Sequence, residues 1–170
     1  MNNGKTIRLQ TRKASENNSK DLCQILNEII AIGGTTGFEN ILSESEFESV
    51  FINGPGLISC FLAENNGLIL GFQSLSHHPD LPSGWADIAT FARVNPKVRG
   101  VGTSLFEATL AFARHLDIET INATIRADNK SGLSYYSKMG FNDYSISKQI
   151  PLQDGTPVDR ISKKITVCIK

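Results

Sequence analysis

Hydrophobic and polar residues follow two different periods along the chain, and these periods predict its strands and helices. Apolar residues that alternate with polar ones are typical of half-buried strands, whereas spacings of three to four residues are typical of amphipathic helices. The first pattern predicts strands over residues 6–12, 57–64, 68–75, 85–94, 119–125, 142–152 and 159–169. The second pattern predicts helices over residues 19–34, within 35–56, and over 103–116 and 129–140.

Turn-forming residues mark where several of these elements begin and end. Ser19 is a candidate N-cap for the first helix, and the glycine pair at 33–34 ends that helix. The Asn-Gly pair at 66–67 predicts a hairpin, because both residues tolerate the positive φ of a primed turn. The Asp-Gly pair at 154–155 predicts a second hairpin, and Gly140 closes the last helix.

The order of the predicted elements indicates the fold class. One strand is followed by two helices, three strands, a helix, a strand, a helix and two strands. This order is typical of an α+β (mixed α/β) domain with about seven strands and about four helices. A length of 170 residues suits one domain with its own core, so we expect a single domain over residues 1–170.

Composition narrows the classes of function. Lysine plus arginine total 17, as do aspartate plus glutamate, so charge gives no reason to expect a nucleic acid or a membrane as partner. The apolar runs are too short to span a bilayer, and the N-terminal residues lack the apolar centre of a secretory signal. Cys23, Cys60 and Cys168 lack metal-ligand spacing and indicate reduced thiols with no metal site. We therefore expect a cytoplasmic protein.

Two glycines at the start of a predicted helix point to an anion-binding site. Gly100 and Gly102 come just before the helix over 103–116, where the amides from Val98 to Thr103 could bind a phosphate group. A nucleotide P-loop would need a lysine after its glycines, and a dinucleotide fingerprint would need a third glycine. The chain has neither. A simple tight turn is the remaining alternative.

Residues 97–102 and 129–141 form a pair of motifs separated by a predicted helix and a predicted strand. The first, "KVRGVG", is similar to Gln/Arg-x-x-Gly-x-Gly/Ala, with Lys97 in the first position. The second, "NKSGLSYYSKMGF", is similar to Asn-x-x-Ala-x-x-x-Tyr-x-x-x-Gly-Phe, with Gly132 in place of alanine. Together they resemble the GNAT superfamily of N-acetyltransferases over roughly residues 5–170. The resemblance implies a mostly antiparallel, twisted central sheet and acetyl-CoA as cosubstrate.

The resemblance also implies roles for particular residues. The backbone of residues 90–92 would meet the thioester oxygen. Tyr136 would protonate the leaving thiolate, with the adjacent Tyr135 as the alternative. Asn129 would contact the pantetheine arm or cap the short helix. Acetyl-CoA binding is thereby assigned to Thr90, Phe91, Ala92, Lys97, Val98, Arg99, Gly100, Val101, Gly102, Thr103 and Asn129.

The general base that deprotonates the amine stays unassigned at this stage. The family's strand glutamate corresponds to Ala86 here, and strand alternation would aim the neighbouring Asp87 away from the site. Histidine has a suitable pKa, but loop histidines are commonly solvated. The remaining candidates are His77, His78, Asp80, His115 and Glu39.

The segment after the first helix bears on the acceptor amine. Residues 35–47 ("TTGFENILSESEF") resemble a segment that lines the acceptor pocket in phosphinothricin-type amino-acid acetyltransferases, and the hairpin over 151–165 would form the opposite wall. A purely structural role for Phe38, packing two helices together, is equally open. The balanced charge argues against a strongly basic peptide acceptor.

The expected function is therefore N-acetylation of a small-molecule amine, such as an amino acid or analogue, by direct attack in a ternary complex. Two alternatives stay open: a protein N-terminal or lysine acetyltransferase, and a non-catalytic acyl-CoA-binding sensor. The edge of the last predicted hairpin could pair two subunits, which leaves a homodimer open as well.

Overall fold

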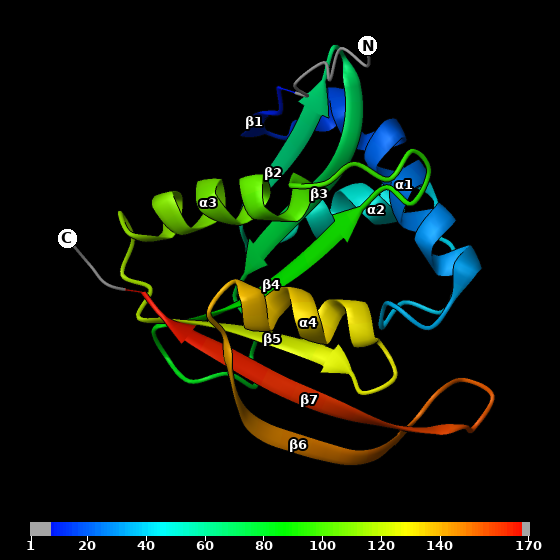
Figure 1. The fold of residues 1–170 in the computed structure, drawn as a ribbon, viewed down its shortest axis with the longest axis vertical. Helices are drawn as coiled ribbons and strands as arrows, with labels where there is room; N and C mark the ends of the chain where they lie inside the picture. The colour runs from blue at the N-terminus through cyan, green and yellow to red at the C-terminus, as the bar shows by residue number, and fades with distance from the viewer. Residues whose placement is uncertain (1–7, 168–170) are drawn as a thin grey trace, which may run out of the picture.

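The structure is a computed structural model that describes residues 8–167, and seven of its strands form one sheet in the order β1-β2-β3-β4-β5-β7-β6 (Figure 1). The strands are β1 (Gln10–Lys13), β2 (Leu57–Asn65), β3 (Leu68–Ser76), β4 (Trp85–Ala92), β5 (Thr120–Arg126), β6 (Asn142–Pro151) and β7 (Pro157–Thr166). The helices are α1 (Ser19–Ile32), α2 (Glu44–Phe51), α3 (Val101–Ala113) and α4 (Lys130–Lys138), and a short 3-10 turn, η1 (Glu16–Asn18), precedes α1.

The sheet is almost entirely antiparallel. Only β4 and β5, at its centre, run parallel, because α3 connects them. The hairpin between β2 and β3 has φ values of 49° at Asn66 and 80° at Gly67, as a primed turn requires. The mixed α/β fold predicted from the sequence, with its seven strands and four helices, is confirmed.

Helices cover both faces of the sheet (Figure 1). On one face, here called the α1–α2 face, the two N-terminal helices pack against β2, β3 and β4. On the opposite α3–α4 face, α3 lies over β2 and β3 and α4 lies over β5. Alternation along β4 divides its side chains between these faces, so that Phe91 packs with α1 and α2 whereas Ile88 packs with α3 and α4.

Phenylalanines dominate the core on the α1–α2 face. Phe47, Phe51, Phe72 and Phe91 are buried, and their contacting rings have centroids 4.8 to 5.7 Å apart. Phe38 joins them from the α1–α2 loop, 5.9 Å from the Phe51 ring. Each aromatic pair stabilises the fold by about 0.5–1.5 kcal/mol beyond its buried area. Phe38 therefore packs against α2 and β4, rather than between two helices, and it holds the loop to the core.

Two helix starts differ from the sequence prediction. Ser19 is the first helical residue of α1 rather than its N-cap, because the 3-10 turn places Asn18 in the capping position. The third helix begins at Val101, two residues before the predicted Thr103. Its N-cap is Gly100, whose φ of 86° lies in the left-handed region that favours glycine.

Some sequence predictions fall partly outside residues 8–167. Predicted strand residues 6–7 and 168–169, and Cys168, are not among the described residues. Cys23 and Cys60 are buried free thiols, and burial raises the pKa of Cys60 to about 12. Within the described range, no helix is long and apolar enough to cross a membrane. The same range contains no group of three or more His, Cys, Asp or Glu side chains arranged to hold a metal ion.

Candidate functional site

The two central strands separate partway along their length. The parallel pairs between β4 and β5 are Trp85 with Thr120, Ala86 with Ile121, and Asp87 with Asn122. Beyond them β4 continues to pair with β3, and β5 with β7, but the two strands no longer pair with each other. Residues 88–92 and 123–126 therefore border an opening in the sheet, called the β4–β5 opening below.

The backbone of β4 presents unpaired amides to this opening. The Arg93 amide donates to the Leu70 carbonyl at 2.7 Å, and hydrogen-bonded pairs alternate along an antiparallel ladder. The register therefore turns the main-chain groups of Phe91 toward β3, and those of Thr90 and Ala92 toward the opening. Of the three residues predicted to meet the thioester oxygen, Thr90 and Ala92 have amides in position to do so.

The glycine turn supplies a second set of free amides. Among residues 8–167, no acceptor binds the amides from Val98 to Thr103, and the first helical bond of α3 runs from the Ser104 amide to the Gly100 carbonyl at 2.9 Å. Unpaired amides at a helix N-terminus, together with the helix dipole, favour an anion. The turn therefore has the properties of a phosphate site.

Two basic side chains flank the same turn. Lys97 and Arg99 are exposed, and neither forms an ion pair with a residue in the described part of the chain. An unpaired guanidinium can bind phosphate oxygens through two donors at once, whereas lysine acts as a point charge. Both side chains add positive charge to the site formed by the amides.

A buried glutamine connects β4 to the two adjacent tyrosines of α4. Gln73, on β3, is fully buried, and its Nε2 donates to Thr90 Oγ1 at 2.8 Å and to Tyr135 Oη at 3.2 Å. Tyr136 Oη lies 2.9 Å from Thr90 Oγ1. Burial raises the pKa of Tyr136, so its phenol keeps its hydrogen and is a donor at neutral pH. The network brings Tyr136 beside the β4–β5 opening.

Tyr135 and Tyr136 have different partners. Tyr135 Oη donates to the Gly102 carbonyl at 2.8 Å, which ties it to the first turn of α3. Within residues 8–167, Thr90 is the only hydrogen-bond partner of the Tyr136 hydroxyl. The Tyr135 hydrogen is therefore already used, whereas the Tyr136 hydroxyl lies beside the hydroxyl and the backbone of Thr90 at the opening. This difference favours Tyr136 over Tyr135 as the acid.

Substituting Gly102 with alanine is expected to destabilise the protein by about 1–3 kcal/mol, the usual cost of overpacking. A Cβ at this position would lie 2.6 Å from Tyr135 Cε2, so the ring would have to move. Urea denaturation measures the change in the free energy of unfolding. In a Tyr135→Ala background the same substitution should cost less, because the ring is gone. An equal cost in both backgrounds would contradict this explanation.

Asn129 is engaged by other parts of the protein. Its Oδ1 accepts from the Gly132 amide at 2.9 Å, which caps α4, and its Nδ2 donates to the Thr35 carbonyl at 2.9 Å. A Cβ at Gly132 would lie 2.5 Å from Asn129 Nδ2, so an alanine here would require the Asn129 side chain to shift. The structure therefore shows the capping role of Asn129, and its contact with the pantetheine arm stays a prediction.

Asp87 lies where β4 and β5 begin to separate. Its neighbour Ala86 packs in the core on the α3–α4 face, so alternation turns Asp87 to the α1–α2 face. The Asn122 side-chain amide donates to Asp87 Oδ1 at 2.6 Å, and the Tyr144 hydroxyl donates to Asn122 Oδ1 at 2.6 Å. Burial raises the pKa of Asp87, and the bond from Asn122 opposes this shift. A carboxylate with a raised pKa is suited to accept a proton.

Most of the other candidates for the general base either carry no proton acceptor or are exposed side chains of loops. Ala86 carries no proton acceptor and is fully buried. His77, His78 and Asp80 are exposed in the loop between β3 and β4. His115 is exposed after the end of α3. Their solvated positions agree with the ordinary behaviour of loop side chains.

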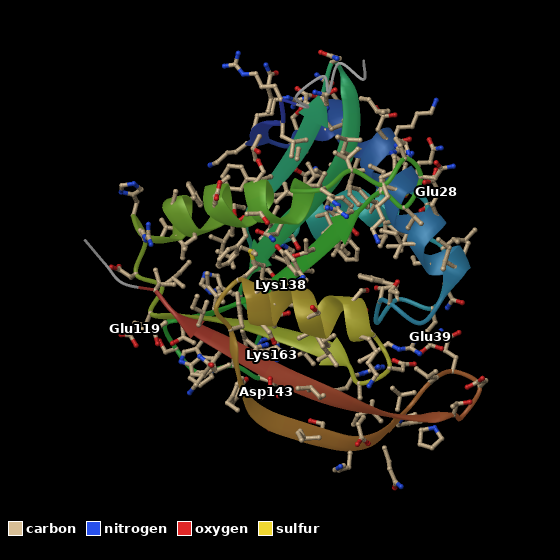
Figure 2. The ribbon with its side chains drawn as sticks, in the orientation of Figure 1. Glu28, Glu39, Glu119, Lys138, Asp143 and Lys163 are labelled. Atoms are coloured by element: carbon tan, nitrogen blue, oxygen red, sulfur yellow. The ribbon has the colours of Figure 1, made fainter. Side chains whose placement is uncertain are left out.

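Two segments far apart in the sequence meet over the α1–α2 face. Glu39, in the loop between α1 and α2, accepts a hydrogen bond from the Gln153 amide of the β6–β7 hairpin at 2.8 Å. Figure 2 shows Glu39 on the side of the molecule where this loop approaches the hairpin. A cavity of about 460 Å³ lies there, lined by loop residues, α2 and Gln153. The two predicted walls of the acceptor pocket are in contact, and their role in binding an acceptor stays a prediction.

Gln73 and Asn122 were not predicted as site residues from the sequence, although each had a weak signal. Gln73 interrupts the apolar strand "LILGFQSL", and Asn122 interrupts "ETINATI". A polar residue in a strand is often solvated, so this signal does not separate an exposed position from a buried one. Both side chains are almost fully buried here, and both hold another site residue by hydrogen bonds.

The sequence matches one family of known proteins. The model of the Acetyltransferase (GNAT) family matches residues 25–141, so the chain belongs to this family. A comparison with curated protein sequences gives no match.

Solved structures share this fold over nearly the whole chain. A GNAT superfamily phosphinothricin acetyltransferase from Sinorhizobium meliloti, in complex with acetyl-CoA, has a TM-score of 0.81 at 18% identity, covering 94% of this chain and 88% of that one. A ribosomal-protein-alanine N-acetyltransferase from Brucella melitensis has a TM-score of 0.81 at 19% identity, covering 92% of this chain and 99% of that one. The yncA protein from Salmonella typhimurium, with its cofactor acetyl-CoA, has a TM-score of 0.79 at 15% identity, covering 95% of each chain. At such identities the likeness shows the fold alone.

Proposed function

We propose that the protein is an acetyl-CoA-dependent N-acetyltransferase that acetylates the primary amine of a small molecule by direct attack in a ternary complex. The observation that carries this proposal is the run of unpaired amides from Val98 to Thr103 at the start of α3. These amides lie in the loop that follows β4 and in the first turn of α3, and β4 borders the β4–β5 opening, where Thr90 and Tyr136 meet. The phosphate site and the reaction site are therefore joined by a short stretch of chain.

The residues present fit the diphosphate and the thioester of acetyl-CoA. The amides of residues 98–103, with Lys97 and Arg99, would hold the diphosphate. The free amides of Thr90 and Ala92 would bind the thioester oxygen and stabilise the negative charge that it acquires during attack. Acetyl-CoA, when bound, supplies an activated acetyl group and a thiol leaving group.

The two faces of the sheet would supply the two proton-transfer groups. Tyr136, on the α3–α4 face, would protonate the sulfur as it leaves. Asp87, on the α1–α2 face, would accept the proton that the amine loses. The β4–β5 opening lies between these faces, so the amine and the thioester would approach it from opposite sides. This arrangement keeps the acid and the base apart.

A small acceptor is supported by the contact that spans the α1–α2 face. The bond between Glu39 and the Gln153 amide joins the α1–α2 loop to the hairpin, and we infer that it narrows access to the opening from that side. One structural neighbour is a phosphinothricin acetyltransferase and another is a ribosomal-protein-alanine N-acetyltransferase, so the fold is compatible with small and protein acceptors. The narrowed access favours the small one.

Acetyl-CoA at about one hundred times its dissociation constant is expected to stabilise the protein by about 2.7 kcal/mol. The reason is that the free amides and the two basic side chains bind the diphosphate only in the folded state. Chemical denaturation with and without the compound measures the effect, and ATP and NAD serve as controls. Stabilisation by ATP or NAD but not by acetyl-CoA would contradict the proposal.

Thiol release from acetyl-CoA across a panel of amines then tests the reaction. Release with small primary amines supports the proposed function. Release only with peptides that carry a free N-terminus or a lysine would indicate a protein acetyltransferase. Binding of acetyl-CoA without release from any amine would indicate a sensor.

A further inference from the structure

Two arginines lie side by side on the adjacent strands β5 and β7. Arg126, the last residue of β5, is paired in register with Arg160 on β7. Lys163, three residues further along β7, points to the opposite face, where it donates to Ser137 and to Asp143 beside α4 (Figure 2). Alternation along both strands therefore places the two arginines on the α1–α2 face.

Arg126 already has a carboxylate partner. Its Nε donates to Asp128 Oδ1 at 2.9 Å and its Nη2 donates to Asp128 Oδ2 at 2.6 Å. The hydrogen bonds that Arg126 donates to Asp128 raise the pKa of Arg126, and the charge of Glu39 adds to this shift. Glu39 therefore lies close to the arginine pair, which places the pair beneath the α1–α2 loop.

Arg160 forms no hydrogen-bonded ion pair of this kind, although its charge helps to lower the pKa of Asp128. It is half-buried, and it forms no ion pair with any residue in the range 8–167. Its Nη1 is buried and has no hydrogen-bond acceptor among those residues. A buried donor of a charged group without an acceptor is costly, so it needs an explanation. A ligand that carries an acceptor anion would provide one.

The arginine pair borders the proposed reaction site. Arg126 ends the segment 123–126, which forms the β5 side of the β4–β5 opening. It lies on the same face as Asp87, the group placed to accept the proton of the amine. A substrate that offers its amine to the opening on this face would therefore extend toward the two arginines.

We propose that Arg160, together with Arg126, binds the carboxylate of the amine substrate, and this inference rests on the proposed function. The planar fork of a guanidinium matches the two oxygens of a carboxylate. Asp128 and Glu39 lie nearby and would repel a doubly charged phosphate more strongly than a single carboxylate. The substrate class is therefore an amine that carries a carboxylate, such as a free amino acid.

The test compares the twenty common L-amino acids with their carboxamides, which keep the amine and lose the negative charge. Two readouts are used on the full chain: thiol release in the presence of acetyl-CoA, and thermal stabilisation by each compound in the presence of CoA. For at least one amino acid we expect a KM about 10- to 50-fold lower than for its carboxamide. The same compound should stabilise the protein more than its carboxamide does.

Three variants make the test specific. Arg160→Gln should remove the preference for the carboxylate and leave the KM for acetyl-CoA unchanged. Arg160→Lys should restore only part of the preference, because lysine keeps the charge without the fork. Lys148→Gln, which removes an exposed positive charge from the same hairpin, should keep the preference in full. Stabilisation by acetyl-CoA shows that each variant is folded.

Equal handling of amino acids and carboxamides by the wild type would overturn the carboxylate site, as would a preference that survives in Arg160→Gln. Carboxylate-dependent stabilisation without thiol release would support the site but overturn the proposed acetyl transfer. Thiol release at the same rate with and without the carboxylate would support the proposed acetyl transfer but overturn the carboxylate site. The failure of this inference and the failure of the proposed function are therefore distinguishable.

Discussion

Replacing Asp87 with asparagine is expected to lower kcat/KM for the amine by about 10²–10⁴, the usual contribution of a general base. The substitution preserves shape, and the new carbonyl oxygen can still accept the hydrogen bond from Asn122 that Asp87 Oδ1 accepts at 2.6 Å. What is lost is the ability to take a proton. Steady-state thiol release measures the change, and acetyl-CoA binding should be unchanged.

The pH dependence gives a second signature of this role. A base must be ionised to act, so wild-type kcat/KM should rise with pH through the pKa of Asp87, which burial raises above its usual range. In the asparagine variant that rise should disappear. Asp80→Asn is the matched control, because Asp80 is an exposed aspartate in the loop that precedes β4. An Asp87→Asn variant that retains the wild-type rate and profile would remove Asp87 from the mechanism.

The Asp87→Asn substitution, which lowers activity, should raise the stability of the folded protein. Because the pKa of Asp87 is raised by folding, its ionisation costs stability as pH rises above the unfolded value of about 4. Below that value both states are protonated and the cost is absent. Asp87→Asn should therefore raise the denaturation midpoint at pH 7, and the gain should vanish in acid. Such a combination is typical of active-site groups that are held in place at the expense of stability.

The elements were predictable because nearly all of them bury one face. In a strand such as β4 or a helix such as α1, the buried residues recur at a regular spacing in the sequence. This spacing can be recognised without knowing which elements pack against the strand or helix. The start of α1 was not predictable in the same way. Both Asn18 and Ser19 are good capping residues, and a preceding 3-10 turn decides between them.

The candidate site was predictable only where its residues are neighbours in the sequence. The glycine turn and the asparagine–tyrosine motif are local patterns. The separation of β4 from β5 is a property of strand pairing, which depends on residues far apart in the chain. Gln73 meets Thr90 and Tyr135 across 17 and 62 positions, and no local signal connects them.

The arginine pair shows the same limit. In the sequence, α4, β6 and the start of β7 separate Arg126 from Arg160, and only the register between β5 and β7 brings the two arginines opposite each other. In the sequence, nothing distinguishes either arginine from an ordinary surface residue. The opening, the proposed acid, the proposed base and the two arginines therefore come together only when the sheet is assembled.

Replacing Tyr136 with phenylalanine is expected to lower kcat by about 10², near the lower end of the range for a general acid. The structure indicates how the hydroxyl could donate to the sulfur. Gln73 Nε2 donates to Thr90 Oγ1, so the Thr90 hydrogen is free to point at Tyr136 Oη, 2.9 Å away. That arrangement leaves the Tyr136 hydrogen available for another acceptor. Single-turnover thiol release measures the loss.

Tyr135→Phe is the matched control, because it removes the same hydroxyl from the adjacent residue. Tyr135 Oη donates to the Gly102 carbonyl at 2.8 Å, so its loss should weaken the contact between α4 and the start of α3. We expect lower stability and weaker acetyl-CoA binding, with a smaller effect on the chemical step. The two tyrosines should thus differ in which quantity changes: kcat for Tyr136 and acetyl-CoA affinity for Tyr135.

The dependence of the rate on pH, and on the pKa of the leaving thiol, tests whether Tyr136 is an acid or has only a structural role. Burial raises the pKa of Tyr136, so the wild-type rate should show no loss from its ionisation at moderately alkaline pH. An acyl donor whose thiol has a lower pKa needs less help in leaving, so it should lose less rate in the Tyr136→Phe variant than acetyl-CoA does. If the two donors lose equal rate, or if Tyr135→Phe reduces kcat more than Tyr136→Phe, the acid is not Tyr136.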